Sequence, residues 1–152
     1  MSDALQPVFN IEKLYVKDLS VEIPNAPAVF MEREAPAMEV NMSTESRNLG
    51  NDVYHSSITV TVTAKIADKT MFLVECTQAG IFRIQNVPQD QLPMVLGIGC
   101  PNIVFPYLRE TVSDVIMRAG FPPLLLNPVN FEALFAQQQA QQQQQAAPAQ
   151  TH

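Results

Sequence analysis

The sequence is poor in the residues that build disulfide scaffolds, metal sites and anion-binding surfaces. Its 152 residues include two cysteines, two histidines, five glycines and no tryptophan. Two cysteines are too few for a disulfide scaffold, and with one nearby histidine they do not complete a tetrahedral zinc site. Nine basic against fifteen acidic residues give a formal charge of −6. This charge disfavours nucleic-acid and membrane-surface binding, because both need clustered cations.

Long apolar runs are missing too. The longest uninterrupted ones are a few residues, well short of the roughly 20 that cross a bilayer. The first residues, MSDALQPVF, lack the basic stretch and apolar centre of a signal peptide. We therefore expect a cytoplasmic protein without membrane insertion, in which Cys76 and Cys100 are buried free thiols.

Catalytic constellations are equally scarce. His55 has no cysteine or acid at ligand spacing, and Gly97-Ile98-Gly99 lacks the third glycine of a dinucleotide fingerprint and the lysine of a P-loop. Cys100 has no basic residue close in sequence that would lower its pKa. We expect neither enzymatic activity nor a cofactor or metal.

Charge and complexity vary along the chain. Residues 1–52 carry a net charge of −5, whereas the remaining hundred carry −1. Residues 136–152 contain nine glutamines and no large apolar side chain. Such a tract has little to bury against the entropy of ordering it, so we expect a disordered tail, with the last helix continuing into it for at most a turn or two. The folded domain is then 1–135.

A period of two dominates the first half and predicts four strands, over residues 9–23, 38–42, 57–66 and 70–84. The first has an irregularity near Leu14, and the polar stretch from Ser43 ends the second. Pro24 and Pro27 indicate an extended connection after the first strand, because proline lacks the N–H that sheets and helices need.

The second half changes to helical spacing. Pro106 begins an amphipathic helix that Gly120 ends, and a shorter or broken helix is expected over residues 89–96. Asn130 is suited to cap a last helix carrying Phe131, Leu134 and Phe135. Strands followed by helices predict an α+β architecture.

Apolar residues also occur where folding alone does not demand them. The strand at 70–84 is apolar on both sides, so its second face is covered by another subunit or by helices of the same chain. Val29, Phe30 and the aromatic residues of the last helix could line a groove that accepts many apolar side chains. The alternative is that these residues simply belong to the hydrophobic core.

Five ordered blocks resemble the SecB family of bacterial protein-export chaperones. They span about Phe9 to Phe135 at the spacing of the family, and read YVKDLSVEIPNAP from Tyr15, DVY from Asp52, QAGIF from Gln78, CPNIVFPYLRE from Cys100 and NPVNFEALF from Asn127.

The resemblance implies a four-stranded antiparallel sheet with helices on one face, assembled as a homotetramer that is a dimer of dimers. It implies an ATP-independent chaperone that holds unfolded secretory precursors and delivers them to the SecA ATPase. Matching positions imply a SecA-docking surface formed by Asp18, Glu22, Leu73 and Glu75. Matching positions on the opposite side of the fourth strand imply that four residues act in packing and oligomer contacts: Phe72, Val74, Cys76 and Gln78.

The family's client groove lies between the connection after the first strand and the last helix. This points to seven residues: Pro24, Pro27, Val29, Phe30, Phe131, Leu134 and Phe135. The glutamine-rich tail departs from the charged tail of familiar members, so no tail contact is carried over. The alternative function is a structural or small-ligand-binding oligomeric α+β domain.

Overall fold

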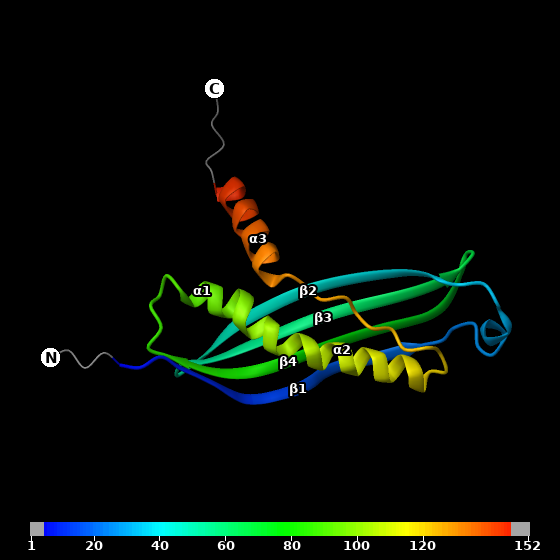
Figure 1. The fold of residues 1–152 in the computed structure, drawn as a ribbon, viewed down its shortest axis with the longest axis horizontal. Coiled ribbons are helices and arrows are strands. Elements are labelled where there is room, and N and C mark those ends of the chain that lie inside the picture. Colours follow the sequence, from blue (N-terminus) through cyan, green and yellow to red (C-terminus); the bar gives the residue numbers. More distant parts are fainter. Residues whose placement is uncertain (1–4, 147–152) are drawn as a thin grey trace, which may run out of the picture.

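The computed structural model describes residues 5–146 and contains one sheet in the order β1-β4-β3-β2. Its strands are β1 (Val8–Glu22), β2 (Ala37–Gly50), β3 (Val53–Ile66) and β4 (Lys69–Gln85), and every neighbouring pair is antiparallel. Figure 1 shows them as long, twisted ribbons with the helices on one face. The sheet and helices confirm the predicted α+β class.

Two strands differ in detail from expectation. β1 has register shifts between Ile11 and Lys13 and between Val16 and Asp18, which flank the irregularity predicted at Leu14. β2 continues eight residues beyond Met42 to Gly50, so the prediction that Ser43 ends it is wrong. The polar residues after Ser43 pair with β3 along an edge of the sheet, where water satisfies the outward backbone groups.

The proline-rich connection is not fully extended. Residues Ala28–Met31 form a 3₁₀ helix, η1, with Pro27 immediately before it. The prediction of an extended connection is therefore wrong for these residues. Proline is tolerated there because the first N–H groups of a helix have no partner within the helix.

The main helix begins earlier than predicted. A short helix, α1 (Leu92–Met94), runs through a π-helical turn, η2 (Val95–Gly99), into α2 (Cys100–Arg118), which places Pro106 inside the helix. The predicted start at Pro106 is wrong. The proline costs less here because it and Asn102, whose carbonyl it leaves without a helical partner, are both exposed to water.

The core lies between α2 and the centre of the sheet. Alternate residues of β3 and β4 are fully buried beneath α2, among them Val60, Val62 and Val74. From α2, Leu108 and Val112 point into the same core, and both are completely buried. The Thr111 hydroxyl donates a 3.2 Å hydrogen bond to Oε1 of Gln78, tying α2 to β4.

The last helix, α3 (Phe131–Ala146), begins as predicted. The side-chain oxygen of Asn130 accepts a 3.0 Å hydrogen bond from the backbone N–H of Ala133, which is the capping geometry expected of asparagine. The helix continues to Ala146, about three turns beyond Phe135, which is further than the turn or two by which it was expected to enter the glutamine-rich tail. The rest of that tail, 147–152, lies outside the described residues.

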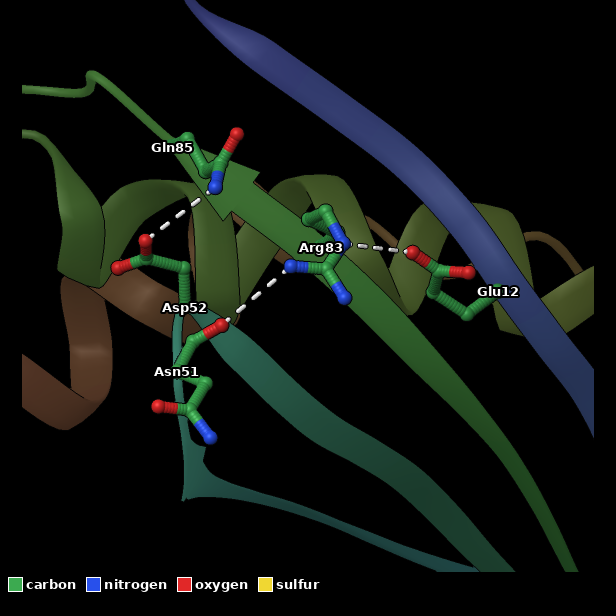
Figure 2. Close-up of polar contacts among 5 residues, drawn as sticks. All are labelled: Glu12, Asn51, Asp52, Arg83 and Gln85. Atoms are coloured by element: carbon green, nitrogen blue, oxygen red, sulfur yellow. Dashed lines mark hydrogen bonds and ion pairs between the residues drawn. The ribbon is translucent and has the colours of Figure 1, made fainter.

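One end of the sheet is joined by side chains (Figure 2). Nε of Arg83 on β4 donates a 2.9 Å bond to the carboxylate of Glu12 on β1, and Nη1 reaches the carbonyl oxygen of Asn51 in the β2–β3 turn at 3.5 Å. Gln85 donates to Asp52 at 3.3 Å. Because the ion pair is about two-fifths exposed, it positions the strand ends more than it stabilises the fold.

Candidate binding groove

A row of β2 side chains on the helix-bearing face of the sheet is left without a helix above it. Val40 lies directly opposite Val62 and Met38 directly opposite Ala64. Val62 and Ala64 are completely buried under α2, whereas Val40 is 44% and Met38 43% exposed. We call this the β2 row, formed by the alternate residues Met38, Val40, Met42, Thr44 and Ser46.

Three hollows follow the β2 row in order. The aromatic hollow, about 450 Å³, includes Met38. The aliphatic hollow, about 370 Å³, includes Val40 and Met42. The glutamine hollow, about 530 Å³, includes Thr44 and Ser46. Together they form what we call the β2 groove.

The chain between α2 and α3 forms the other wall of the groove. Leu124 lines both the aromatic and the aliphatic hollow, and Leu134 of α3 lines the aliphatic one. This segment is firmly attached, because the side chain of Leu126 is buried and Arg109 of α2 donates a 2.9 Å bond from Nε to the Leu126 carbonyl oxygen. The eight steps from Met38 to Ser46 span about 26 Å, the length of about eight extended residues.

Stacked phenylalanines form one end of the groove. The rings of Phe30 and Phe121 have centroids 5.0 Å apart, and Phe121 lies 4.9 Å from Phe72. Phe30 is 45% exposed whereas the other two are buried. Gly120 has φ +95°, and a Cβ at this position would stand 3.0 Å from the Phe30 ring. The positive φ favours glycine at this position, and any larger residue would also displace the Phe30 ring.

The structure distributes the seven predicted groove residues among different surroundings. Val29 and Phe30 line the aromatic hollow, Leu134 the aliphatic hollow and Phe135 the glutamine hollow. The remaining three do not line the β2 groove: Phe131, Pro24 and Pro27.

Their positions explain the difference. Phe131 is buried and packs edge-on against Phe105 at 5.8 Å, so it anchors α3 to the core. Pro24 and Pro27 are exposed on either side of the turn that leads into η1. These three residues do not line the β2 groove, and their role in client binding stays a prediction.

The β2 row was missed as a groove wall. The alternation at Met38, Val40 and Met42 predicted a strand, and no role in a groove was predicted for its apolar side. The signal that could have identified them is the shortage of helices, because one long helix cannot cover four strands about 4.8 Å apart.

The four residues implied for SecA docking share the sheet face that bears no helix. Glu22 pairs with Leu73, Ser20 with Glu75 and Asp18 with Thr77, and directly paired residues project on the same side. The three carboxylates are exposed and Leu73 is half-buried among them. The structure thus brings Asp18, Glu22, Leu73 and Glu75 onto one acidic patch.

The four residues implied for oligomer contacts do not lie on the surface, where a direct contact between subunits would require them. Phe72, Val74, Cys76 and Gln78 are all buried in the core beneath α2. They can affect assembly only through the shape of the sheet, and their implied oligomer role stays a prediction. A second exposed apolar row lies at the other edge of the sheet, on the helix-bearing face, which we call the β1 row: Phe9, Ile11, Val16 and Leu19.

Titratable groups in the core are held neutral by burial. Burial raises the pKa of Cys76 to about 11, with a contribution from Asp18, and raises that of Cys100 to about 12. Both thiols are buried and free, as predicted. On the helix-free face, the Tyr15 hydroxyl lies 2.6 Å from Nε2 of His55 and reaches it diagonally over β4, where Tyr15 pairs with Ala79 and His55 with Ile81.

The structure adds two observations on other kinds of site. Within residues 5–146, no three or more His, Cys, Asp or Glu side chains gather as a metal site would require. In that same part of the chain, no helix has the length and apolarity needed to span a membrane.

These features define a class: an α+β protein whose helices cover only part of one sheet face and leave an open groove beside them. The family model described as Preprotein translocase subunit SecB matches residues 2–142. The chain belongs to the SecB family of protein-export proteins.

Named relatives extend over the whole chain. The chain is 87% identical to the Protein-export protein SecB of Thiobacillus denitrificans, over the full length of both. It is 61% identical to the protein of that name from Methylobacillus flagellatus, over 97% of this chain and 93% of that one.

A SecB-like chaperone of Mycobacterium tuberculosis, solved with a peptide from an antitoxin, has a related fold. The TM-score is 0.64 at 15% identity, over 80% of this chain and 91% of that one.

Proposed function

We propose that the protein is an ATP-independent chaperone of the cytoplasm that holds unfolded secretory precursors in the β2 groove until they are exported. The observation that carries the proposal is the row of three hollows along one uncovered strand. An extended polypeptide presents side chains at intervals that match such a row. Membership of the SecB family and a related fold seen with a bound peptide support this reading.

The chemistry of the groove fits a client without a fixed sequence. Met42 and four leucines line its central part, and flexible side chains of this kind adapt to different apolar partners. Each hollow is small, so the contacts in one hollow are weak and several must act together. Binding then depends on an extended chain of about eight residues, which a folded protein does not offer.

The acidic patch of the opposite sheet face is proposed as the docking surface for SecA. Asp18, Glu22 and Glu75 are exposed there, on the side of the sheet away from the groove. A partner can therefore dock while a client is bound. Release then follows from competition or translocation by SecA, an energy source outside this chain.

Assembly as a dimer of dimers is proposed from the β1 row and the family resemblance. Ile11 is 49% and Leu19 41% exposed on a strand edge that nothing else in the described residues covers. An exposed apolar row on an unpaired edge favours a second copy of the chain as its cover.

The client proposal is tested by placing a charge at two points of the groove with Phe30→Asp and Leu134→Asp together. We expect at least a tenfold loss of affinity for an unfolded precursor, because each carboxylate must lose water when an apolar segment binds. The matched control is Asn41→Asp with Asn10→Asp, which adds the same charge at two exposed positions on the opposite face of the sheet. Undiminished suppression of client aggregation by the first variant would reject the groove. Native mass spectrometry of the purified protein distinguishes the small-ligand alternative, which requires a retained ligand.

The docking proposal is tested separately with Glu75→Lys. We expect weaker SecA binding in titration calorimetry and unchanged client affinity, because the patch and the groove lie on opposite faces. Lys65→Glu serves as a charge-reversal control on another strand. Wild-type SecA affinity of the Glu75 variant would reject the acidic patch.

A further inference from the structure

The glutamine hollow differs in chemistry from the other two. Its lining combines five apolar residues, Leu92, Pro93, Leu96, Pro101 and Phe135, with six uncharged polar side chains and a single charged residue, Glu45. The six are Thr44, Ser46, Gln89, Gln138, Gln139 and Gln142. By contrast, the aliphatic hollow has one polar side chain, Asn127, among apolar residues.

The polar lining comes from a change along one face of α3. Phe131 and Phe135 are four residues apart and face the body of the protein, with Phe131 in the core and Phe135 against Gly97. Continuing along the same face at helical spacing are Gln138 and Gln142. α3 therefore carries an apolar anchor over its first turns and a row of amides beyond it, where it leaves the sheet (Figure 1).

The row of amides suits one kind of ligand. A glutamine side chain offers both N–H donors and a carbonyl acceptor, as a peptide group does. The three glutamines are exposed at the hollow, and Thr44 and Ser46 add hydroxyls from β2 on the opposite wall. The polar part of this lining can pair with N–H and C=O groups of any sequence, while the apolar residues of the same hollow can contact the side chains between them.

We propose that the glutamine hollow is a subsite for the backbone of an extended polypeptide whose apolar side chains occupy the other two hollows. The inference rests on the proposed client function and adds the chemistry of one end of the groove. An unfolded client has unpaired backbone groups along its whole length, so a sequence-independent subsite continues the groove beyond its apolar part. The glutamine side chains recognise the peptide groups of the client through hydrogen bonds, and the charge of the client plays no part.

The experiment compares peptides that share one apolar anchor of about five residues, the length of the β2 row from Met38 to Met42 along the two apolar hollows. One carries an extension of eight Gly and Ala residues, made at either terminus, and another the same extension with N-methylated peptide groups, which have no N–H donor. With the full-length oligomer we expect one of the ordinary extensions to raise affinity about fivefold, as one or two net hydrogen bonds would. The N-methylated extension is expected to give no more than half of that gain.

Two triple variants test whether the gain in affinity from the extension arises at the glutamine hollow. Gln138→Ala with Gln139→Ala and Gln142→Ala should remove the gain from the extension while leaving the affinity for the anchor unchanged. Gln137→Ala with Gln141→Ala and Gln144→Ala changes the other side of α3 and should retain the gain. Alanine preserves the helix, because it has the highest helix propensity, and circular dichroism verifies this.

The outcomes separate the inference from the proposed function. If the anchor binds but the extension adds nothing, or adds equally when N-methylated or in the first triple variant, the backbone subsite is rejected and the groove stands. If the anchor itself does not bind, both are rejected. If the first triple variant loses affinity for SecA but keeps the gain from the extension, the glutamine row is a partner surface and the inference is overturned.

Discussion

The two edges of the sheet carry apolar rows of similar exposure but different shape. On the β1 row, Ile11 is 49% and Val16 43% exposed, and on the β2 row Val40 is 44% and Met38 43% exposed. The hollows described above follow the β2 row, whereas none of them includes a β1 residue. Exposure alone therefore does not distinguish a subunit contact from a client groove.

The difference comes from the segment that follows α2. Residues 121–130 return along β2, held by the buried side chains of Phe121 and Leu126, and build a second wall opposite the strand. β1 has no such wall. We infer that a row with one wall suits a flat, permanent partner, and a row between two walls suits an extended chain that enters and leaves.

The largest expected effect is on assembly. Ile11→Glu with Leu19→Glu places two charges on the β1 row, which would be buried without partners in a subunit contact. We expect the mass measured by analytical ultracentrifugation to fall to that of a smaller species. The control, Lys13→Glu with Ser20→Glu, alters the other face of β1 and should leave the mass unchanged. An unchanged mass for the first variant would remove the β1 row from the assembly surface.

The next expected effect is on client binding. Val40→Asp introduces a charge at the middle of the β2 row, and we expect about tenfold weaker binding of an unfolded precursor with the same oligomeric mass. Anisotropy of a labelled client measures this, and Asn41→Asp, one residue away on the opposite face, is the control. Equal losses in both variants would mean that general charge, not the groove, governs binding.

A matched pair of smaller substitutions compares the covered and uncovered parts of the same face. Val62→Ala removes buried methyl groups beneath α2 and should cost about 2 kcal/mol in the free energy of unfolding. Val40→Ala, directly across the strand pair, should cost less than about 1 kcal/mol because the side chain is half exposed. Denaturant unfolding measures both. Similar costs would show that the β2 row is covered in solution.

The smallest expected effect concerns pH. Burial lowers the pKa of His55, and the nearby Lys17 and Arg47 lower it further, while Glu45 opposes them. The unfolded chain then binds the proton more readily than the folded one, so stability falls as the pH falls through about 6.5. His55→Gln should flatten the dependence of unfolding free energy between pH 7.5 and 5.5. An identical slope in the variant would assign it to other groups.

The sequence predicted the sheet well because its strands follow a clear period of two. The predicted ends of β3 and β4 lie within a few residues of those in the structure, and Asn130 was correctly identified as the cap of α3. The start of α2 was missed because Pro106 reads as a first-turn residue, although an exposed proline is tolerated within a long helix. The helix extends further into the glutamine-rich tail than expected because glutamine has a good helix propensity and α3 is already nucleated by its cap.

The groove was only partly predictable, for a geometric reason. Phe30, Leu134 and Phe135 could be chosen as apolar residues on a loop and a helix. The β2 row could not be separated from core residues, since Val40 and Val62 belong to equally regular alternations. What separates them is the lateral position of α2 over the sheet, and nothing in the local pattern of β2 reports where a helix some sixty residues later will pack.

The central claim is that unfolded clients bind along the β2 row, and methionine methyl groups test it most directly. In the full-length oligomer labelled at methionine methyls, addition of an unfolded precursor should shift the NMR signals of Met38 and Met42, which line the groove. The signal of Met117, which is exposed on α2 and lines none of the three hollows, should stay in place. Unmoved signals at Met38 and Met42 with a client bound would contradict the account.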